Sequence, residues 1–275
     1  MQVVPSEDHM RALTEEWSGE RFPDGRPKVS DAVLATLRGA TTEQAWSVLR
    51  THGYDRQFAG DWRETHPGRV IAGRAVTAQF LPHRPDLDRA VVEAGFRAGH
   101  VEGDRQNSWI IDRLGEGDVM VVDIFGKVIE GTVIGDNLGT AVATRTRVGA
   151  VIDGGVRDLQ GLQSLDGVNV FMRGVDPTPI RNVTLAGINI PIRIGHATVL
   201  PGDVVLGTPT GVIFIPAHLA EEVAEQSREI QERDRFGKLR LSERVYSSAQ
   251  IDVPTWRAEI EADFQRWRTS EGART

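Results

Sequence analysis

The stretch GDNLGTAVATRTRVGAVIDGGVRD, residues 135–158, decides how this chain folds. It begins with Gly135-Asp136 and ends with Arg157-Asp158. Its middle carries apolar residues at helical spacing and then becomes a continuous apolar run, which predicts a helix followed by a buried strand. A helix between two strands is the usual crossover connection of a parallel sheet, so the stretch indicates an α/β fold.

The two ends of this stretch are expected to meet in space. The segment KVIEGTVIG, 127–135, reads as a strand, and the strand AVID, 150–153, should run parallel to it. Parallel strands joined by a helical crossover have their carboxyl ends at the same edge of the sheet. We therefore expect Gly135-Asp136 to lie beside the loop DGGVRD, 153–158.

The rest of the chain fits the same fold class. Residues 1–65 read as a helical N-terminal extension packed on the core, and residues 66–240 as the α/β domain. Within that domain, HLAEEVAEQSREIQERDRFG, 218–237, predicts a long amphipathic helix. Residues 241–275 read as a C-terminal tail with a terminal helix near 254–268.

Composition narrows the possible functions. The chain has 32 lysines and arginines against 39 acids and no basic run, which argues against a nucleic-acid partner. It has no cysteine, which excludes disulfides, thiolate nucleophiles and zinc–thiolate or iron–sulfur sites. The N-terminus lacks the apolar core of a signal peptide, and no apolar run approaches membrane-spanning length. We therefore expect a soluble cytoplasmic protein with no membrane partner.

The residue types at the two ends of the stretch suit one kind of chemistry. Asp158 offers oxygen ligands to a hard divalent metal, and Arg157 offers a permanently charged fork to a carboxylate or an enolate oxygen. Asp136 is a candidate proton acceptor, and the free N–H groups of the helix start attract a carboxylate. Gly154-Gly155 would leave room for a ligand. Together these groups suit a 2-oxo acid whose enolate is stabilised by a bound metal.

Plainer interpretations of the same residues stay open. Asp136 can act only as a helix cap, and Arg157-Asp158 can be an exposed ion pair, which are the commoner roles in an arbitrary α/β protein. Lys127 offers a different route to aldol cleavage through a Schiff base. Its place in a predicted turn, however, is typical of a solvated charge.

The stretch resembles the signature of the RraA-like family, which includes class II 4-hydroxy-4-methyl-2-oxoglutarate aldolases and the regulator of ribonuclease E activity. Aldolase members carry an Asp, then twenty residues, then Arg-Asp, and Asp136 is followed here by twenty residues and Arg157-Asp158. The first position is typically not an acid in the regulators, so Asp136 favours the enzyme. The resemblance covers roughly residues 28–235 and includes SDAV, IAGRAVTAQF, LPGDVVLG and GVIFIP.

The resemblance implies a compact β/β/α swivelling-type domain with helical N-terminal and C-terminal extensions. It implies a homotrimer or homohexamer with the site between subunits. Asp158 would bind Mg²⁺ or Mn²⁺, Arg157 would steady the pyruvate enolate, and Asp136 would orient a metal-bound water that carries the proton. The substrate-binding residues that it implies are Gly135, Asn137, Leu138 and Arg157.

The implied function is a divalent-metal-dependent lyase that cleaves a 4-hydroxy-2-oxo acid by a retro-aldol reaction to pyruvate and a carbonyl compound. Oxaloacetate decarboxylation could follow from the same enolate. The alternative is a non-enzymatic regulator that binds a ribonuclease or another protein partner. Three features depart from the family pattern. Gly161 stands where an acid is common, and the closing segment reads GTPTG, 207–211, where the family often carries acids. The acid that a neighbouring subunit's C-terminal helix donates in the aldolases has Glu229 and Glu232 as candidates here.

Overall fold

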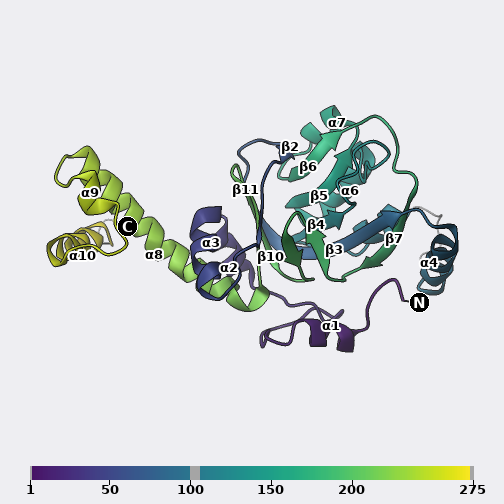
Figure 1. The fold of residues 1–275 in the computed structure, drawn as a ribbon, viewed down its shortest axis with the longest axis horizontal. Helices are drawn as coiled ribbons and strands as arrows, with labels where there is room; N and C mark the ends of the chain where they lie inside the picture. The colour runs from purple at the N-terminus through teal and green to yellow at the C-terminus, as the bar shows by residue number, and fades with distance from the viewer. Residues whose placement is uncertain (1, 100–105, 273–275) are drawn as a thin grey trace.

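The computed structural model describes residues 2–99 and 106–272, and a mixed β-sheet lies at its centre (Figure 1). The strands of this sheet are β1 (Phe58–Ala59), β2 (Arg63–Glu64), β3 (Ile71–Pro82), β4 (Asp118–Asp123), β5 (Gly149–Val156), β6 (Asn169–Val175), β7 (Val183–Ile188), β10 (Val204–Thr208) and β11 (Gly211–Ile215). They lie in the order β1-β11-β10-β3-β4-β5-β6-β2, and β7 also pairs with β3. This is the α/β architecture that the crossover stretch predicts.

Strands β3, β4, β5 and β6 form the parallel half of the sheet, with Val121 paired to Val151 near its middle. Each strand is a nearly continuous apolar run because both of its faces are buried. In β4, Val119 and Val121 belong to the core layer on one face, whereas Met120 and Val122 belong to the layer on the other. The parallel half therefore separates two hydrophobic layers.

Helices cover one face of this parallel half, and a small β-hairpin covers the other. The helices are α4 (Pro85–Arg97), α5 (Gln106–Ile111), α6 (Asp136–Thr146) and α7 (Leu159–Gln163), and the hairpin strands are β8 (Ile192–Ile194) and β9 (Ala197–Val199). Leu138 and Val142 of α6 reach the layer beneath the helices. Ile192 and Val199 of the hairpin reach the opposite layer. The crossover helix α6 thus lies directly above the parallel strands that it connects.

The N-terminal part of the chain contains short, capped helices and the two edge strands β1 and β2. Its helices are α1 (Glu7–Leu13), α2 (Asp31–Leu37) and α3 (Thr42–Thr51). Ser30 caps α2 by accepting from the backbone N–H of Val33, as its position predicts. Thr41 and Gln44 form a capping box at the start of α3, and Gly53, with a φ of 83°, follows its end.

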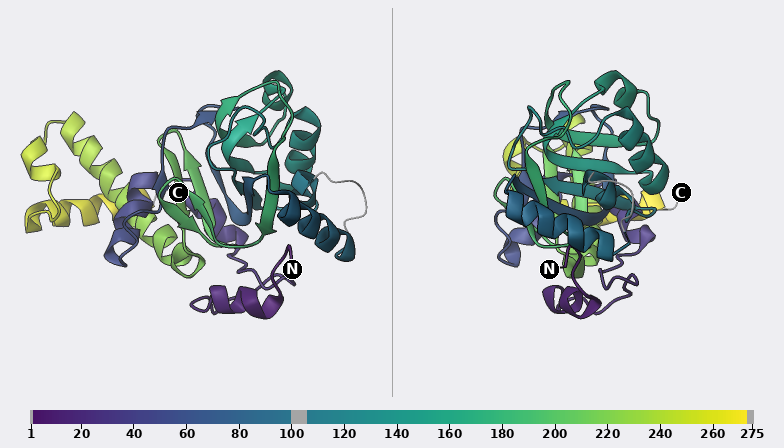
Figure 2. Two further views of the ribbon diagram at one scale, coloured as in Figure 1. Left: turned by 45° about the vertical axis from the view of Figure 1, so that its right-hand side comes forward. Right: turned by 90° about the vertical axis from the view of Figure 1, so that its right-hand side faces the viewer.

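The C-terminal part begins on the body of the molecule and then leaves it (Figure 2). Its elements are the short 3-10 helix η1 (Ala217–Leu219), α8 (Ala220–Ser242), α9 (Ser248–Ile251) and α10 (Ala258–Gly272). The first turns of α8 pack on α2 and α3, and its second half extends outward to carry α9 and α10. We call residues 229–272 the arm. The arm has its own small core, in which Phe236, Ile260 and Phe264 are buried.

The strand predicted over 127–135 is not formed. Only Thr132 makes a parallel bridge, to Gly155, and positive φ angles at Phe125, Gly126 and Glu130 interrupt any extended run. The alternation of apolar residues in this segment reflects a loop that packs on the sheet. No helix among the described residues is both long and apolar enough to cross a membrane. The division of the chain at residues 65 and 240 stays a prediction.

Candidate functional site

The two ends of the stretch 135–158 meet at the carboxyl edge of the parallel strands. The backbone N–H of Arg157 donates to Ile134 O at 3.0 Å, and the N–H of Val133 donates to Gly155 O at 3.0 Å. The segment before α6 therefore runs alongside the last residues of β5. A Cβ placed on Gly135 would lie 2.3 Å from Asp158 Oδ2 and 3.0 Å from Arg157 Nε. This is the juxtaposition that the crossover predicts.

The loop before Gly135 packs closely against three glycines of β5 and β6. A Cβ on Gly154 would lie 2.8 Å from Lys127 O, and one on Gly155 would lie 2.7 Å from Val128 O. A Cβ on Gly174 would meet Val128 Cγ1 at 2.8 Å. The space beside Gly154 and Gly155 is thus filled by the chain itself. The prediction that these two glycines leave room for a ligand is wrong.

Asp136 opens helix α6 and is exposed. Its Oδ1 accepts from the backbone N–H of Asn137 at 2.7 Å, so this carboxylate already occupies one donor of the first helical turn. The N–H groups of a first turn have no partner within the helix, which leaves Leu138 as a further donor toward an anion. The N-cap of α6 is Gly135 and no side chain caps the helix, so the plainer interpretation of Asp136 as a helix cap is wrong.

Asp158 stands where β5 turns into α7, with φ 52° and ψ 45°. This left-handed conformation is uncommon for any residue except glycine, although aspartate tolerates it better than most. The side chain of Asp158 does not cap α7, and Oδ2 lies 3.5 Å from Arg157 Nε. Both side chains keep 43% of their surface exposed. The turn thus holds a carboxylate and a guanidinium side by side, facing solvent.

Helix α7 packs directly on Asp136 through Gly161. A Cβ on Gly161 would lie 2.6 Å from Asp136 Cβ, closer than two carbon atoms can approach. Gly139 of α6 is equally constrained, because its Cβ would lie 2.2 Å from Leu162 Cδ2. These contacts explain why residue 161 is a glycine and not the acid that was expected at this position. No larger residue fits there while Asp136 keeps its place.

The acids of this site fit a hydrated divalent ion better than a closed metal cage. Among the described residues, no group of three or more histidines, cysteines or acids is arranged to hold a metal. Asp158 is instead a single half-exposed carboxylate. Mg²⁺ is typically held by one or two carboxylates together with waters and substrate oxygens, which matches such a donor set.

Three other charged candidates lie away from this cluster. Glu229 and Glu232 are exposed on α8, which packs on α2 and α3 of its own chain and not on α6 or α7. Lys127 donates to Arg181 O at 3.0 Å and meets Glu130 at 3.4 Å. The ammonium group of Lys127 is therefore held in a surface turn as an ordinary charge.

A row of polar side chains that was not predicted from the sequence lies at the same edge of the sheet, on the face away from the helices. Asp123 ends β4 and Asp153 lies beside it in β5. Gln79 donates to Asp123 at 3.0 Å, and Arg173 donates to Asp153 at 2.6 Å. Asp123 also accepts from the N–H of Phe125 at 2.9 Å, which fixes the start of the loop that leads to Gly135. The signal in the sequence was an acid directly after each apolar run, in VVD and VID.

Comparison with known proteins identifies the family of this chain. A family model described as RraA-like, Aldolase/RraA, matches residues 26–214. A putative 4-hydroxy-4-methyl-2-oxoglutarate aldolase of Halalkalibacterium halodurans is 30% identical over 129 residues, which are 47% of this chain and 60% of that protein. The chain thus spans less than two thirds of the length of this curated relative.

Two solved structures share the fold. An uncharacterized protein from Pseudomonas syringae pv. tomato matches with a TM-score of 0.67 and 22% identity, over 85% of this chain and 99% of the other. Streptomyces coelicolor RraAS2, described as an unusual member of the RNase ES inhibitor RraA protein family, matches with a TM-score of 0.66 and 22% identity, over 81% and 100%. These likenesses confirm the predicted fold class.

Proposed function

This chain belongs to the RraA-like family, and we propose that it is a divalent-metal-dependent lyase acting on a 2-oxo acid. The family includes 4-hydroxy-4-methyl-2-oxoglutarate aldolases as well as RraA regulators. The proposed reaction is retro-aldol cleavage of a 4-hydroxy-2-oxo acid to pyruvate and a carbonyl compound, with oxaloacetate decarboxylation as a side activity. The observation that carries the proposal is the contact of Gly135 with Arg157 and Asp158.

The first requirement of this reaction is that the substrate's carboxylate and keto group be held. The first turn of α6 points backbone N–H groups and the positive end of the helix dipole toward the cluster, which suits a carboxylate. The guanidinium of Arg157 lies beside that helix start and can bind the keto oxygen. Its fork geometry and permanent charge favour an oxygen that becomes more negative during reaction.

The second requirement is that the enolate be stabilised as the bond between C3 and C4 breaks. A divalent ion on Asp158 would supply Lewis-acid stabilisation of the developing enolate charge. The C4 hydroxyl loses its proton and becomes the carbonyl of the departing product, and the bonding electrons pass to the enolate of pyruvate. C3 of that enolate then takes up a proton to give pyruvate.

In this proposal Asp136 orients the water that takes the proton from the C4 hydroxyl. One of its carboxylate oxygens is engaged with the N–H of Asn137, and the residue is exposed at the mouth of the cluster. Gly161 allows α7 to approach Asp136 closely from the other side. A carboxylate at the mouth of the cluster is the kind of group that general base catalysis uses.

The site also has a bearing on assembly. Arg157 and Asp158 are each 43% exposed in a single chain, whereas enolate chemistry benefits from a site that excludes water. We propose that a neighbouring subunit covers the cluster in a homotrimer or homohexamer. Glu229 and Glu232, on the outward surface of α8, are the candidate acids that such a neighbour would contribute.

Isosteric variants test the catalytic roles. Asp136→Asn and Asp158→Asn should each lower pyruvate release from 4-hydroxy-4-methyl-2-oxoglutarate by about 100-fold or more, because proton transfer and metal binding need the ionised carboxylates. Asp166→Asn, an exposed acid just beyond α7, is the matched control and should retain full activity. Circular dichroism checks that each variant is folded. Unchanged turnover in both site variants would refute the assignment.

A further inference from the structure

Two turns of this chain are built alike around a buried aspartate. The N–H of Gly115 donates to Asp118 Oδ2 at 2.9 Å, and the N–H of Leu200 donates to Asp203 Oδ2 at 2.8 Å. In each turn the aspartate's own N–H returns a bond of 3.2 Å to the residue three positions earlier. Asp118 is 1% exposed and Asp203 is 4% exposed. Each aspartate leads into a strand of the sheet.

The two turns differ in how the buried charge is compensated. Arg26 reaches Asp118 with Nη1 at 3.1 Å from Oδ1, and the side chain of Arg26 is itself only 5% exposed. Among residues 2–99 and 106–272, no arginine or lysine is paired with Asp203, whose carboxylate receives only the backbone N–H groups of Leu200 and Ala217. A buried carboxylate without a counter-charge is an unfavourable arrangement. Burial accordingly raises the pKa of Asp203 to about 7.

Asp203 lines a cavity of about 270 Å³, which we call the Asp203 cavity. The cavity lies between the segment 13–17 that follows α1, the residues 54–57, and the start of η1. It has no lysine or arginine in its lining. Burial lowers the pKa of His218, so that this ring is neutral near pH 7. The rings and acids that line the cavity, apart from Asp203, are Trp17, Tyr54, His218, Glu15 and Glu16.

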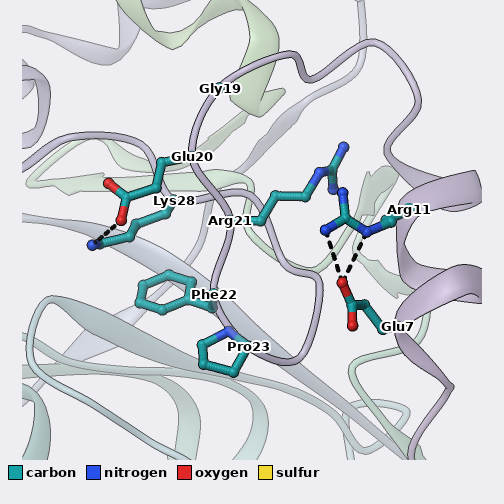
Figure 3. A pocket seen from close by; sticks show the side chains of 8 residues that line it. All are labelled: Glu7, Arg11, Gly19, Glu20, Arg21, Phe22, Pro23 and Lys28. Atoms are coloured by element: carbon teal, nitrogen blue, oxygen red, sulfur yellow. Dashed lines mark hydrogen bonds and ion pairs between the residues drawn. The ribbon is translucent and has the colours of Figure 1, made fainter.

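A second hollow nearby serves as a contrast (Figure 3). It measures about 530 Å³ and carries both acids and cations. Its charges already satisfy one another, because Arg11 meets Glu7 at 2.8 Å and Lys28 meets Glu20 at 2.7 Å. Arg21 is used to bind neutral oxygens of its own loop, including Gly25 O at 2.8 Å. The acids of that hollow are thus paired with cations, whereas Asp203 in the other cavity is not.

We propose that the Asp203 cavity binds a small organic cation bearing an ammonium group, which neutralises Asp203 as Arg26 neutralises Asp118. Aromatic faces such as those of Trp17 and Tyr54 attract cations, and hydrogen bonds between ammonium and carboxylate are among the stronger ones. The volume lies just below the usual range for ligand sites, so it suits a molecule of few heavy atoms. This site is separate from the cluster at Gly135, Arg157 and Asp158.

The proposal makes the affinity for the cation depend on pH. Binding of an ammonium group favours the ionised form of Asp203, so a proton is released when the cation binds near pH 6. The other titratable groups at the cavity are Glu15, Glu16, Tyr54 and His218. Burial lowers the pKa of His218, and protonation of this ring would weaken cation binding, as protonation of Asp203 does. Arg21, which bonds to Thr14 Oγ1 of the lining at 2.7 Å, keeps its charge throughout.

Calorimetry with n-propylammonium chloride, compared with neutral 1-propanol, tests the proposal on the full-length protein. We expect saturable binding of n-propylammonium alone, with affinity rising about tenfold between about pH 6 and pH 8 as Asp203 ionises. Repeating the titration near pH 6 in buffers of different ionisation enthalpy should reveal release of close to one proton. Asp203→Asn should abolish both the pH dependence and the proton release, whereas Glu259→Gln, an exposed acid on α10, should change neither.

Several results would overturn the proposal. They are equal binding of n-propylammonium and 1-propanol, absence of saturable binding, or an affinity that does not change with pH. The proton count on the unmodified protein keeps the test decisive if Asp203→Asn fails to fold. Glu16→Gln provides a second variant at the exposed rim of the cavity, and it should weaken n-propylammonium binding without removing its pH dependence.

Discussion

Gly135 and Asp158 are in direct contact, although they lie at opposite ends of a helical crossover. A methyl group on Gly135 would come within 2.3 Å of Asp158 Oδ2. The helix start and the carboxylate that follows β5 are therefore fitted to each other at the level of single atoms. The absence of a side chain at residue 135 is what permits this arrangement.

Gly135→Ala tests the contact directly. The added methyl group would push away the carboxylate of Asp158 and the side chain of Arg157, which are half exposed and free to move. We expect pyruvate release to fall by about 100-fold, the usual effect of misplacing reacting groups by an ångström, with little loss of stability. Gly39→Ala is the matched control, because its Cβ would make an ordinary contact at 3.5 Å. Full activity in Gly135→Ala would contradict the geometry proposed for the site.

Gly161→Ala tests the positioning of Asp136 by α7. The new Cβ would lie 2.6 Å from Asp136 Cβ, so helix α7 or Asp136 must shift. We expect kcat to fall by roughly tenfold or more with a smaller change in KM, because the group that orients the proton-accepting water moves while the carboxylate-binding helix start remains. Steady-state kinetics of the folded variant checks this. A change in KM alone would mean that Asp136 binds substrate without taking part in proton transfer.

Arg26→Met tests the buried ion pair with Asp118. Loss of the guanidinium leaves the carboxylate of Asp118 buried without a counter-charge. We expect the free energy of unfolding, measured in urea, to fall by about 3 kcal/mol. Lys28→Met, which removes an exposed partner of Glu20, should change it by less than about 1 kcal/mol. Equal effects of the two substitutions would show that the buried pair contributes no more to the free energy of unfolding than the exposed pair does.

The pH dependence of the free energy of unfolding should report the ionisation of Asp203. Its pKa is about 7 in the folded protein against 3.8 for an ordinary aspartate, so the folded state holds a proton that the unfolded chain releases. The proton on Asp203 contributes fully to the free energy of unfolding below about pH 4, and this contribution is lost as the pH rises through about 7. Between about pH 5 and pH 8, the unmodified protein should lose roughly 3 kcal/mol more stability than Asp203→Asn. Parallel pH profiles for the two proteins would contradict this.

Phe264→Ala tests the independence of the arm. Phe236, Ile260 and Phe264 form a core of their own, apart from the layers of the sheet. Removing one of these side chains should cost about 3 kcal/mol within the arm, enough to unfold α9 and α10 locally. Hydrogen exchange should then accelerate in residues 243–272 while β3 to β6 keep their protection. Loss of protection in the sheet would show that arm and body unfold together.

The sequence predicts the meeting of Gly135 with Arg157 and Asp158, because a helical crossover returns the chain to the same edge of the sheet, although the segment before the helix is a loop with one bridge and not the expected strand. It does not predict the loop at 127–131. The apolar residues there pack on Gly154, Gly155 and Gly174, and that contact depends on glycines elsewhere in the chain. Local alternation of apolar residues is the same for a strand and for such a loop.

The two aspartate turns illustrate a second limit. LGEGDVMVVD and LPGDVVLG look alike as sequence, and the structure builds both with the same local hydrogen bonds. What separates them is Arg26, which is distant from both turns in the chain and pairs with Asp118 but not with Asp203. Charge compensation of a buried group is a tertiary property, so the distinct state of Asp203 appears only in the folded structure.

The most direct test of the central claim is pyruvate release from 4-hydroxy-4-methyl-2-oxoglutarate and from oxaloacetate, measured first with EDTA and then with added Mg²⁺ or Mn²⁺. After subtraction of the release measured without protein at the same metal concentration, we predict no release with EDTA and restored release with either metal, in the unmodified protein but not in Asp158→Asn. Release that persists in EDTA would contradict the metal-dependent site. Absence of release from folded protein with both metals would contradict the proposed lyase activity and favour a regulatory role.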